Sequence, residues 1–97
     1  MFDKMKQVME MKKQADRIKK ELDASSVESN DVRGIKIVIN GSQYIQSVEV
    51  DEAMLNAQNK SRFEADLMRS VNAAIKKSQN LAAQKMKALM PGGFPGL

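Results

Sequence analysis

Three carboxylates stand close together near the middle of the chain, where they could support acid–base chemistry. They are Glu49, Asp51 and Glu52. The chain contains no histidine and no cysteine, so the commonest general base and the thiolate nucleophile are both absent. No serine stands in a nucleophile elbow, and no Gly-rich loop matches a phosphate cradle. We therefore expect these carboxylates to cap a helical turn rather than to catalyse, and we predict no enzymatic activity, metal site, cofactor or small-molecule substrate.

Basic residues form the second group with a chemical role. Sixteen Lys and Arg against twelve Asp and Glu give a net charge of +4, and residues 67–97 carry five basic groups and no acidic one. Such cations can simply complement the helix dipole and solvate a polar face. Surface helices usually mix both signs, however, so a long helix with no acidic residue after Asp66 favours phosphate binding. The candidate DNA-binding residues are Lys12, Lys13, Arg17, Lys19, Lys20, Arg69, Lys76, Lys77, Lys85 and Lys87.

The chain lacks the known sequence motifs with which proteins recognise a base sequence. It has no helix-turn-helix signature, no zinc-ligand spacing and no aromatic ribonucleoprotein motif, and only 4% of its residues are aromatic. Because stacking platforms for single strands are so few, duplex DNA gripped through its backbone is the favoured partner.

The amino-terminal residues predict a long helix that ends near Ala24. From Phe2 onwards this segment contains no Pro or Gly and is rich in Met, Lys, Gln and Glu. Its apolar positions step by three and four residues, as in a short heptad pattern: Val8, Met11, Ala15, Ile18 and Leu22. This seam fits either a helix on its own sheet or one that meets another subunit. Charged residues interrupt the segment too often for a signal peptide or membrane span, so we expect a soluble intracellular protein.

A β-hairpin is predicted next. Residues 25–31 predict a short edge strand or a loop, and Ile35, Ile37 and Ile39 alternate along a firmer strand. The pair Asn40-Gly41 predicts a tight turn with positive φ angles. In the returning strand we expect Tyr44, Val48 and Val50 on one side and Ile45 on the other.

A second long helix follows a helical turn at residues 51–55. Ser61 and Glu64 fit a capping box at its start, and Pro91 stops it after about Met90. At about 1.5 Å per residue it would be on the order of 40 Å long, so part of it should project beyond a small sheet or pack on a partner. We predict one domain over residues 1–90 and a flexible Pro/Gly tail over residues 91–97.

The order of these parts resembles the YbaB/EbfC family of bacterial nucleoid-associated proteins. The matching segments are IKIVING, SVEVDEAML, DLMRSVNAAIKKSQ and MPGGFPGL, and the stretch from Val38 to Leu55 is the most specific. The family often has a Gly-rich turn before the central strand, and here SNDVRG retains only Gly34.

The resemblance implies an α+β fold, in which an α-β-β-β-α protomer with an antiparallel sheet and two long helices forms an intertwined, tweezer-like homodimer. It also implies double-stranded DNA binding largely without sequence specificity, a place on the cytoplasmic nucleoid, and an influence on DNA conformation, nucleoid organisation and gene expression. The alternative is a helix-mediated protein interaction adaptor with no direct nucleic-acid role, which would use a Met-rich surface that includes Met5, Met9 and Met11.

Overall fold

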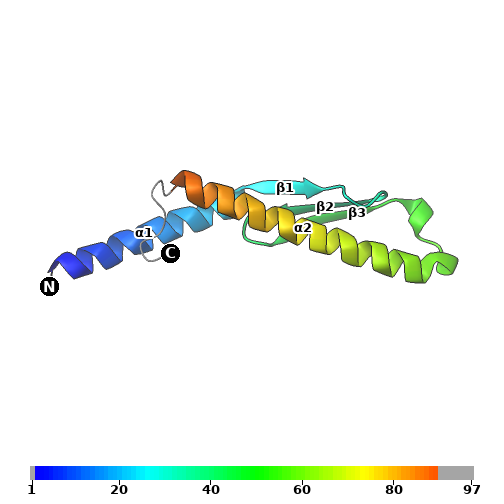
Figure 1. Cartoon of the computed structure of the whole chain (residues 1–97), viewed down its shortest axis with the longest axis horizontal. Helices are drawn as coiled ribbons and strands as arrows, with labels where there is room; N and C mark the ends of the chain where they lie inside the picture. The colour runs from blue at the N-terminus through cyan, green and yellow to red at the C-terminus, as the bar shows by residue number, and fades with distance from the viewer. Residues whose placement is uncertain (1, 90–97) are drawn as a thin grey trace.

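The computed structural model describes residues 2–89 as two long helices and a three-stranded sheet (Figure 1). The element order is α-β-β-β-α with two short 3₁₀ turns before the last helix, so the predicted order is confirmed. The molecule is elongated, with extents of 67 × 20 × 18 Å. The predicted tail over residues 91–97 lies outside the described residues.

The first helix, α1, spans Phe2–Ala24 as predicted. Its apolar seam divides into two halves with different surroundings. In the carboxyl half, Ile18 is 7% exposed and Leu22 is half-buried, because this half packs on α2 and β2 of the same chain. In the amino half, Val8 and Met11 are 65% and 61% exposed. Figure 1 shows this half of α1 running beyond the sheet and beyond α2.

The sheet has the antiparallel order β1-β2-β3, with β1 at Ser26–Ser29, β2 at Ile35–Asn40 and β3 at Ile45–Val50. Residues 25–31 thus contain a strand rather than only a loop. Between β1 and β2 the chain adopts a positive φ of 91° at Gly34. Glycine adopts such an angle without steric cost, so this one glycine is enough for the turn. Ile35, Ile37 and Ile39 are at most 2% exposed and form the core with Ala74 of α2.

The turn between β2 and β3 differs from the prediction. The positive φ lies at Gln43 (64°), and neither Asn40 nor Gly41 has a positive φ. The buried Asn40 holds the turn instead, because its Oδ1 accepts hydrogen bonds from Ser42 N at 3.0 Å and Tyr44 N at 2.9 Å. Gly41 is required for a close approach: a Cβ there would lie 3.0–3.2 Å from atoms of Leu22 in α1.

An irregularity in the pairing of β2 with β3 overturns the expected orientation of Ile45. Ile37 pairs with Val48, but the register shifts between Val38 and Ile39, so that Ile39 pairs with Ile45. A bulge places one extra residue on one strand and reverses the alternation beyond it. Because paired residues project to the same face of a sheet, Ile45 lies on the same face as Val48. On this face of the sheet, α2 packs against β2.

The second helix, α2, spans Lys60–Leu89, so it begins one residue before Ser61. The cap lies further upstream, where Asn56 accepts from Gln58 N at 2.9 Å and starts the 3₁₀ turn Ala57–Asn59, which leads directly into α2. The other 3₁₀ turn, Glu52–Met54, confirms the predicted helical turn. α2 packs along β1 and β2, and it also contacts α1 of the same chain, where Lys85 lies near Glu21.

Candidate nucleic-acid interface

The five basic residues predicted on α1 are all exposed: Lys12, Lys13, Arg17, Lys19 and Lys20. None of them lies within 4.0 Å of an acidic group among the residues that the structure describes. Their charges are therefore not neutralised by direct ion pairs in this part of the chain. Such cations are available to replace the counterions of a phosphate.

These cations occupy different sides of α1 relative to its apolar seam. Lys13 and Lys20 are seven residues apart and lie opposite the seam, with Arg17 between them on the same outward side. Lys12 and Lys19 flank the seam instead. Lys6 was not among the predicted site residues, yet it precedes Lys13 by seven residues and is exposed. The seven-residue spacing in the sequence places Lys6 on the same side of α1 as Lys13. We call Lys6, Lys13, Arg17 and Lys20 the outer stripe.

Three of the five predicted cations on α2 are held in ion pairs within the chain. Lys77 Nζ lies 2.8 Å from Asp31 Oδ1 and also donates to the Glu28 carbonyl oxygen at 3.3 Å. Lys85 Nζ lies 3.7 Å from Glu21 Oε2 and so links α2 to α1. Arg69 lies 2.5 Å from the buried carboxylate of Asp66. These three cations therefore have structural partners that a phosphate would have to displace.

Lys76 and Lys87 are the two predicted α2 cations that stay exposed without an ion pair among the described residues. Lys76 stands immediately before the paired Lys77. The structure thus divides the ten predicted residues: seven carry cations with no acidic partner in residues 2–89, and three take part in the packing of the fold. Charge and helical position alone do not distinguish these two groups.

The clustered carboxylates also differ from their expected role. Asp51 occupies the cap position of the Glu52–Met54 turn, but its side chain makes no capping hydrogen bond. The backbone of Asp51 stabilises the turn instead, because its carbonyl oxygen accepts a hydrogen bond from the Met54 amide at 3.0 Å. Glu49 lies across the strands from Lys36 at 3.6 Å. Glu49 therefore pairs with a cation on the neighbouring strand, whereas Asp51 holds the turn through its backbone and not through its carboxylate.

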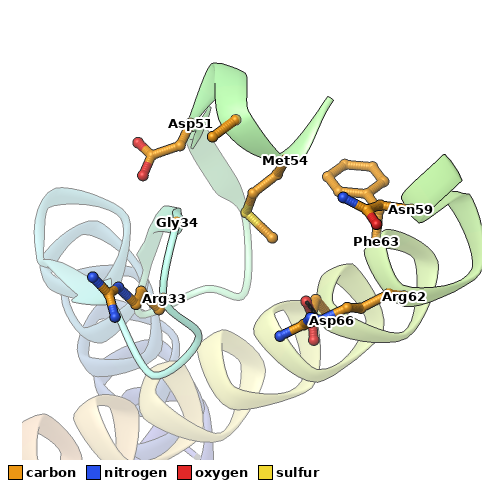
Figure 2. Close-up of a pocket in the computed structure, with 9 residues that line it drawn as sticks. Arg33, Gly34, Asp51, Met54, Asn59, Arg62, Phe63 and Asp66 are labelled. Atoms are coloured by element: carbon orange, nitrogen blue, oxygen red, sulfur yellow. Dashed lines mark ion pairs between the residues drawn. The ribbon is translucent and has the colours of Figure 1, made fainter. Parts of the chain in front are cut away.

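A cavity of about 400 Å³ lies at the end of the sheet near the start of α2 (Figure 2). Arg33 and Gly34 line one side, and Arg62 and Asp66 of α2 line the other. The Asp66 carboxylate is already shared between Arg69 at 2.5 Å and Arg62 at 4.0 Å. Arg33 and Asp51 also line the cavity, and no ion pair involves either of them among the described residues.

No helix among residues 2–89 is both long enough and apolar enough to cross a membrane. The described residues also contain no group of three or more acidic side chains arranged to hold a metal ion.

Comparison with known proteins identifies the family. The model of the YbaB/EbfC DNA-binding family matches residues 1–94. The chain belongs to this family. A nucleoid-associated protein of Syntrophobacter fumaroxidans is 32% identical over 98 residues, which cover 99% of this chain and 89% of that protein. Another from Pelotomaculum thermopropionicum is 34% identical over 95 residues, covering 96% of this chain and 90% of that protein.

A third relative, from Chloroflexus aurantiacus, is also called a nucleoid-associated protein and is 29% identical over 94 residues, covering 96% of this chain and 93% of that protein. The similarity to YbaB/EbfC proteins therefore extends over both helices and the sheet. Membership of a DNA-binding family favours a role at nucleic acid over the adaptor alternative, and it is consistent with a binding protein rather than an enzyme.

Proposed function

We propose that this YbaB/EbfC protein forms a homodimer that binds double-stranded DNA through phosphate contacts, largely without sequence preference. It would act on the cytoplasmic nucleoid and influence DNA conformation, nucleoid organisation and gene expression. The relatives named nucleoid-associated proteins support this location and role. The observation that carries the proposal is the set of exposed cations along α1 that have no acidic partner within residues 2–89.

The outer stripe is the part of α1 best suited to the contact. From Lys6 to Lys20 it extends over about 21 Å at 1.5 Å per residue. Duplex DNA carries one charge per about 1.7 Å of helix axis, so several phosphates lie within reach of a rod of this length. The exposed Lys76 and Lys87 of α2 are proposed as additional contacts.

The stripe also accounts for weak sequence preference. Its side chains are lysines and one arginine, and lysine acts on phosphate as a flexible point charge without a fixed hydrogen-bonding geometry. Phosphate contacts set the position of a protein on the duplex but carry no direct sequence information. Affinity should therefore depend steeply on salt and weakly on the sequence of the duplex.

Fluorescence anisotropy with two unrelated duplexes of equal length, each titrated over a range of salt concentrations, tests the proposal. We expect similar affinities for both duplexes and a linear fall of log K with log salt. The double variant Lys13→Gln/Arg17→Gln should reduce the slope by about 1.8 for each α1 that contacts the duplex, at about 0.9 per phosphate.

Lys36→Gln is the matched control, because the Lys36 Nζ lies on the sheet at 3.6 Å from both Glu28 and Glu49. It should leave the slope unchanged. Salt-insensitive binding, or a double variant with the slope of the unmodified chain, would refute phosphate contacts by the outer stripe.

A further inference from the structure

The amino half of α1 projects from the fold, and the other end of the helix sets its direction. Residues 3–17 are all exposed, whereas Ile18 is 7% exposed and Leu22 is half-buried. Figure 1 shows the amino half extending beyond the sheet and beyond α2. Within the described chain, the last two turns of α1 therefore fix where the outer stripe points.

The turn that follows β2 caps this carboxyl end of α1. A helix leaves its last four carbonyl groups without intrahelical partners. One of them, Leu22 O, accepts a hydrogen bond from Gly41 N at 2.9 Å, and Gly41 N also donates to Ser25 O at 2.9 Å. The next carbonyl, Asp23 O, accepts from Asn40 Nδ2 at 3.4 Å. Asn40 and Gly41 thus cap a helix that lies far from them in the sequence.

Asn40 connects this cap to the sheet and to α2. Its side chain is buried, and its Oδ1 accepts from the backbone amides of Ser42 and Tyr44 while its Nδ2 donates to Asp23 of α1. An asparagine can do this because its amide carries both an acceptor and donors. The carbonyl oxygen of Asn40 accepts from Ser78 Oγ of α2 at 2.7 Å. The end of α1, the β2–β3 turn and α2 therefore meet at this one residue.

Two polar contacts nearer the surface hold the same end of α1. Ser42 Oγ donates to the Asp23 carboxylate, so the turn contacts α1 through a side chain as well as through its backbone. On α2, Lys85 Nζ lies 3.7 Å from Glu21 Oε2. Contacts from two separate elements fix the direction of a helix better than contacts at a single point. We call Leu22, Asp23, Asn40, Gly41 and Ser42 the α1 junction.

We propose that Asn40 is a positioning residue for DNA binding, which fixes the direction in which α1 presents the outer stripe. The inference rests on the proposed function and adds to it a residue that acts without touching DNA. Lys6 and Leu22 lie about 24 Å apart along the helix at 1.5 Å per residue, so a tilt of about 10° at the junction moves Lys6 by about 4 Å. This displacement exceeds the length of a hydrogen bond to a phosphate oxygen, which is about 3 Å. A firm junction therefore keeps the stripe pre-organised for a duplex.

Asn40→Ala tests the inference by removing the side chain at the centre of the junction. If α1 then takes the productive direction about one time in ten, the apparent affinity for a duplex falls about tenfold. The slope of log K against log salt should stay unchanged, because the bound state makes the same number of phosphate contacts. Ser42→Ala, at an exposed position, should cause a smaller loss of affinity in the same direction.

Ser78→Ala is the matched control. It removes the hydrogen bond from α2 to the Asn40 carbonyl oxygen and leaves the polar contacts of α1 in place. None of the three substitutions changes the charge of the chain. A general loss of stability should therefore affect Asn40→Ala and Ser78→Ala alike, whereas loss of direction should appear in Asn40→Ala and not in Ser78→Ala.

Spin labels measure the direction of α1 in the absence of DNA. The chain has no cysteine, so Glu10→Cys on the projecting half of α1 and Asn72→Cys on α2 give two unique, exposed attachment sites. Chain with both labels is diluted into an excess of the same variant without labels, so that double electron–electron resonance reports distances within one chain. We expect a narrow distance distribution with Asn40 present and with Ser78→Ala, and a broader one with Asn40→Ala.

Several results would overturn the inference. They are an unchanged distribution in folded Asn40→Ala, a broader distribution without loss of affinity, an equal effect of Ser78→Ala, or a loss of affinity with a reduced salt slope. In the last case phosphate contacts, rather than the direction of α1, would have been lost. If Asn40→Ala does not fold, Ser42→Ala decides, and an unchanged distribution in that variant overturns the inference.

The distance measurement also separates this inference from the proposed function. If the unmodified chain binds no duplex, the DNA-binding proposal fails, whatever the labels report about the junction. If the unmodified chain binds duplex with the expected salt dependence while Asn40→Ala matches it in both affinity and distance distribution, DNA binding stands and the positioning role of Asn40 is wrong.

Discussion

Two neighbouring lysines on α2 offer a sharp test of the idea that existing ion pairs decide which cations are available to DNA. Lys76 is exposed and has no acidic partner within residues 2–89. The Nζ of Lys77 lies 2.8 Å from Asp31 and 3.3 Å from the Glu28 carbonyl oxygen. Lys76→Gln and Lys77→Gln remove the same charge from adjacent positions of one helix, so their effects can be compared directly.

The expected effect of Lys76→Gln follows from counterion release. One phosphate contact contributes about 0.9 to the slope of log K against log salt, so its loss should weaken binding about 15-fold near 0.05 M salt and about 4-fold near 0.2 M. Lys77→Gln should leave the slope nearly unchanged. It should instead lower the free energy of unfolding by about 0.2–1 kcal/mol, because both partners of its ion pair are more than a third exposed.

Anisotropy titrations at several salt concentrations measure the slopes, and urea denaturation at a fixed chain concentration measures the stability. A slope that falls equally in both variants would contradict the reasoning, since the pair with Asp31 would then not withhold Lys77 from DNA. A normal slope in Lys76→Gln would remove this residue from the interface while leaving the outer stripe of α1 untested.

Three substitutions in the fold should change the free energy of unfolding by different amounts, because they alter different contacts. Gly41→Ala should lower stability by about 1–3 kcal/mol, because its Cβ would meet Leu22 at 3.0–3.2 Å, and the urea midpoint should fall without a change in m. Ser78→Ala should cost about 1–2 kcal/mol, because its buried hydroxyl donates to Asn40 O at 2.7 Å. Ser70→Ala should be neutral or raise the thermal midpoint, because the buried Ser70 hydroxyl has no hydrogen-bond partner among the described residues. A Ser70→Ala variant as damaged as Ser78→Ala would contradict this comparison.

The helices and strands were predictable because the signals for them are local. α1 ends at Ala24, and β2 follows the alternation of Ile35, Ile37 and Ile39. The bulge in the β2–β3 pairing was not predictable in this way. The register of a strand depends on its partner, and one extra residue moves Ile45 to the face of Val48 without any change in composition.

The family match confirms DNA as the expected kind of partner, whereas the residues that contact DNA stay a prediction. Basic residues on two helices pointed to a polyanion, and the structure leaves the cations of α1 exposed. The partners of Lys77 and Lys85 are Asp31 and Glu21, which are far away in sequence. Only the packing of α2 against the sheet and α1 brings these charges together, so segment-wise charge counts overestimate the free positive charge of α2.

The arrangement of α1 explains how a protein with so small a core could present cations at a fixed spacing. Its seam and its outer stripe lie on opposite sides of the same helix. If the seam of each α1 is held against a second copy, the stripe is forced outward and loses the freedom that a lone projecting helix would have, which lowers the entropy cost of binding a duplex. Changes in the seam should therefore weaken assembly and DNA binding together, whereas changes in the stripe should weaken DNA binding alone.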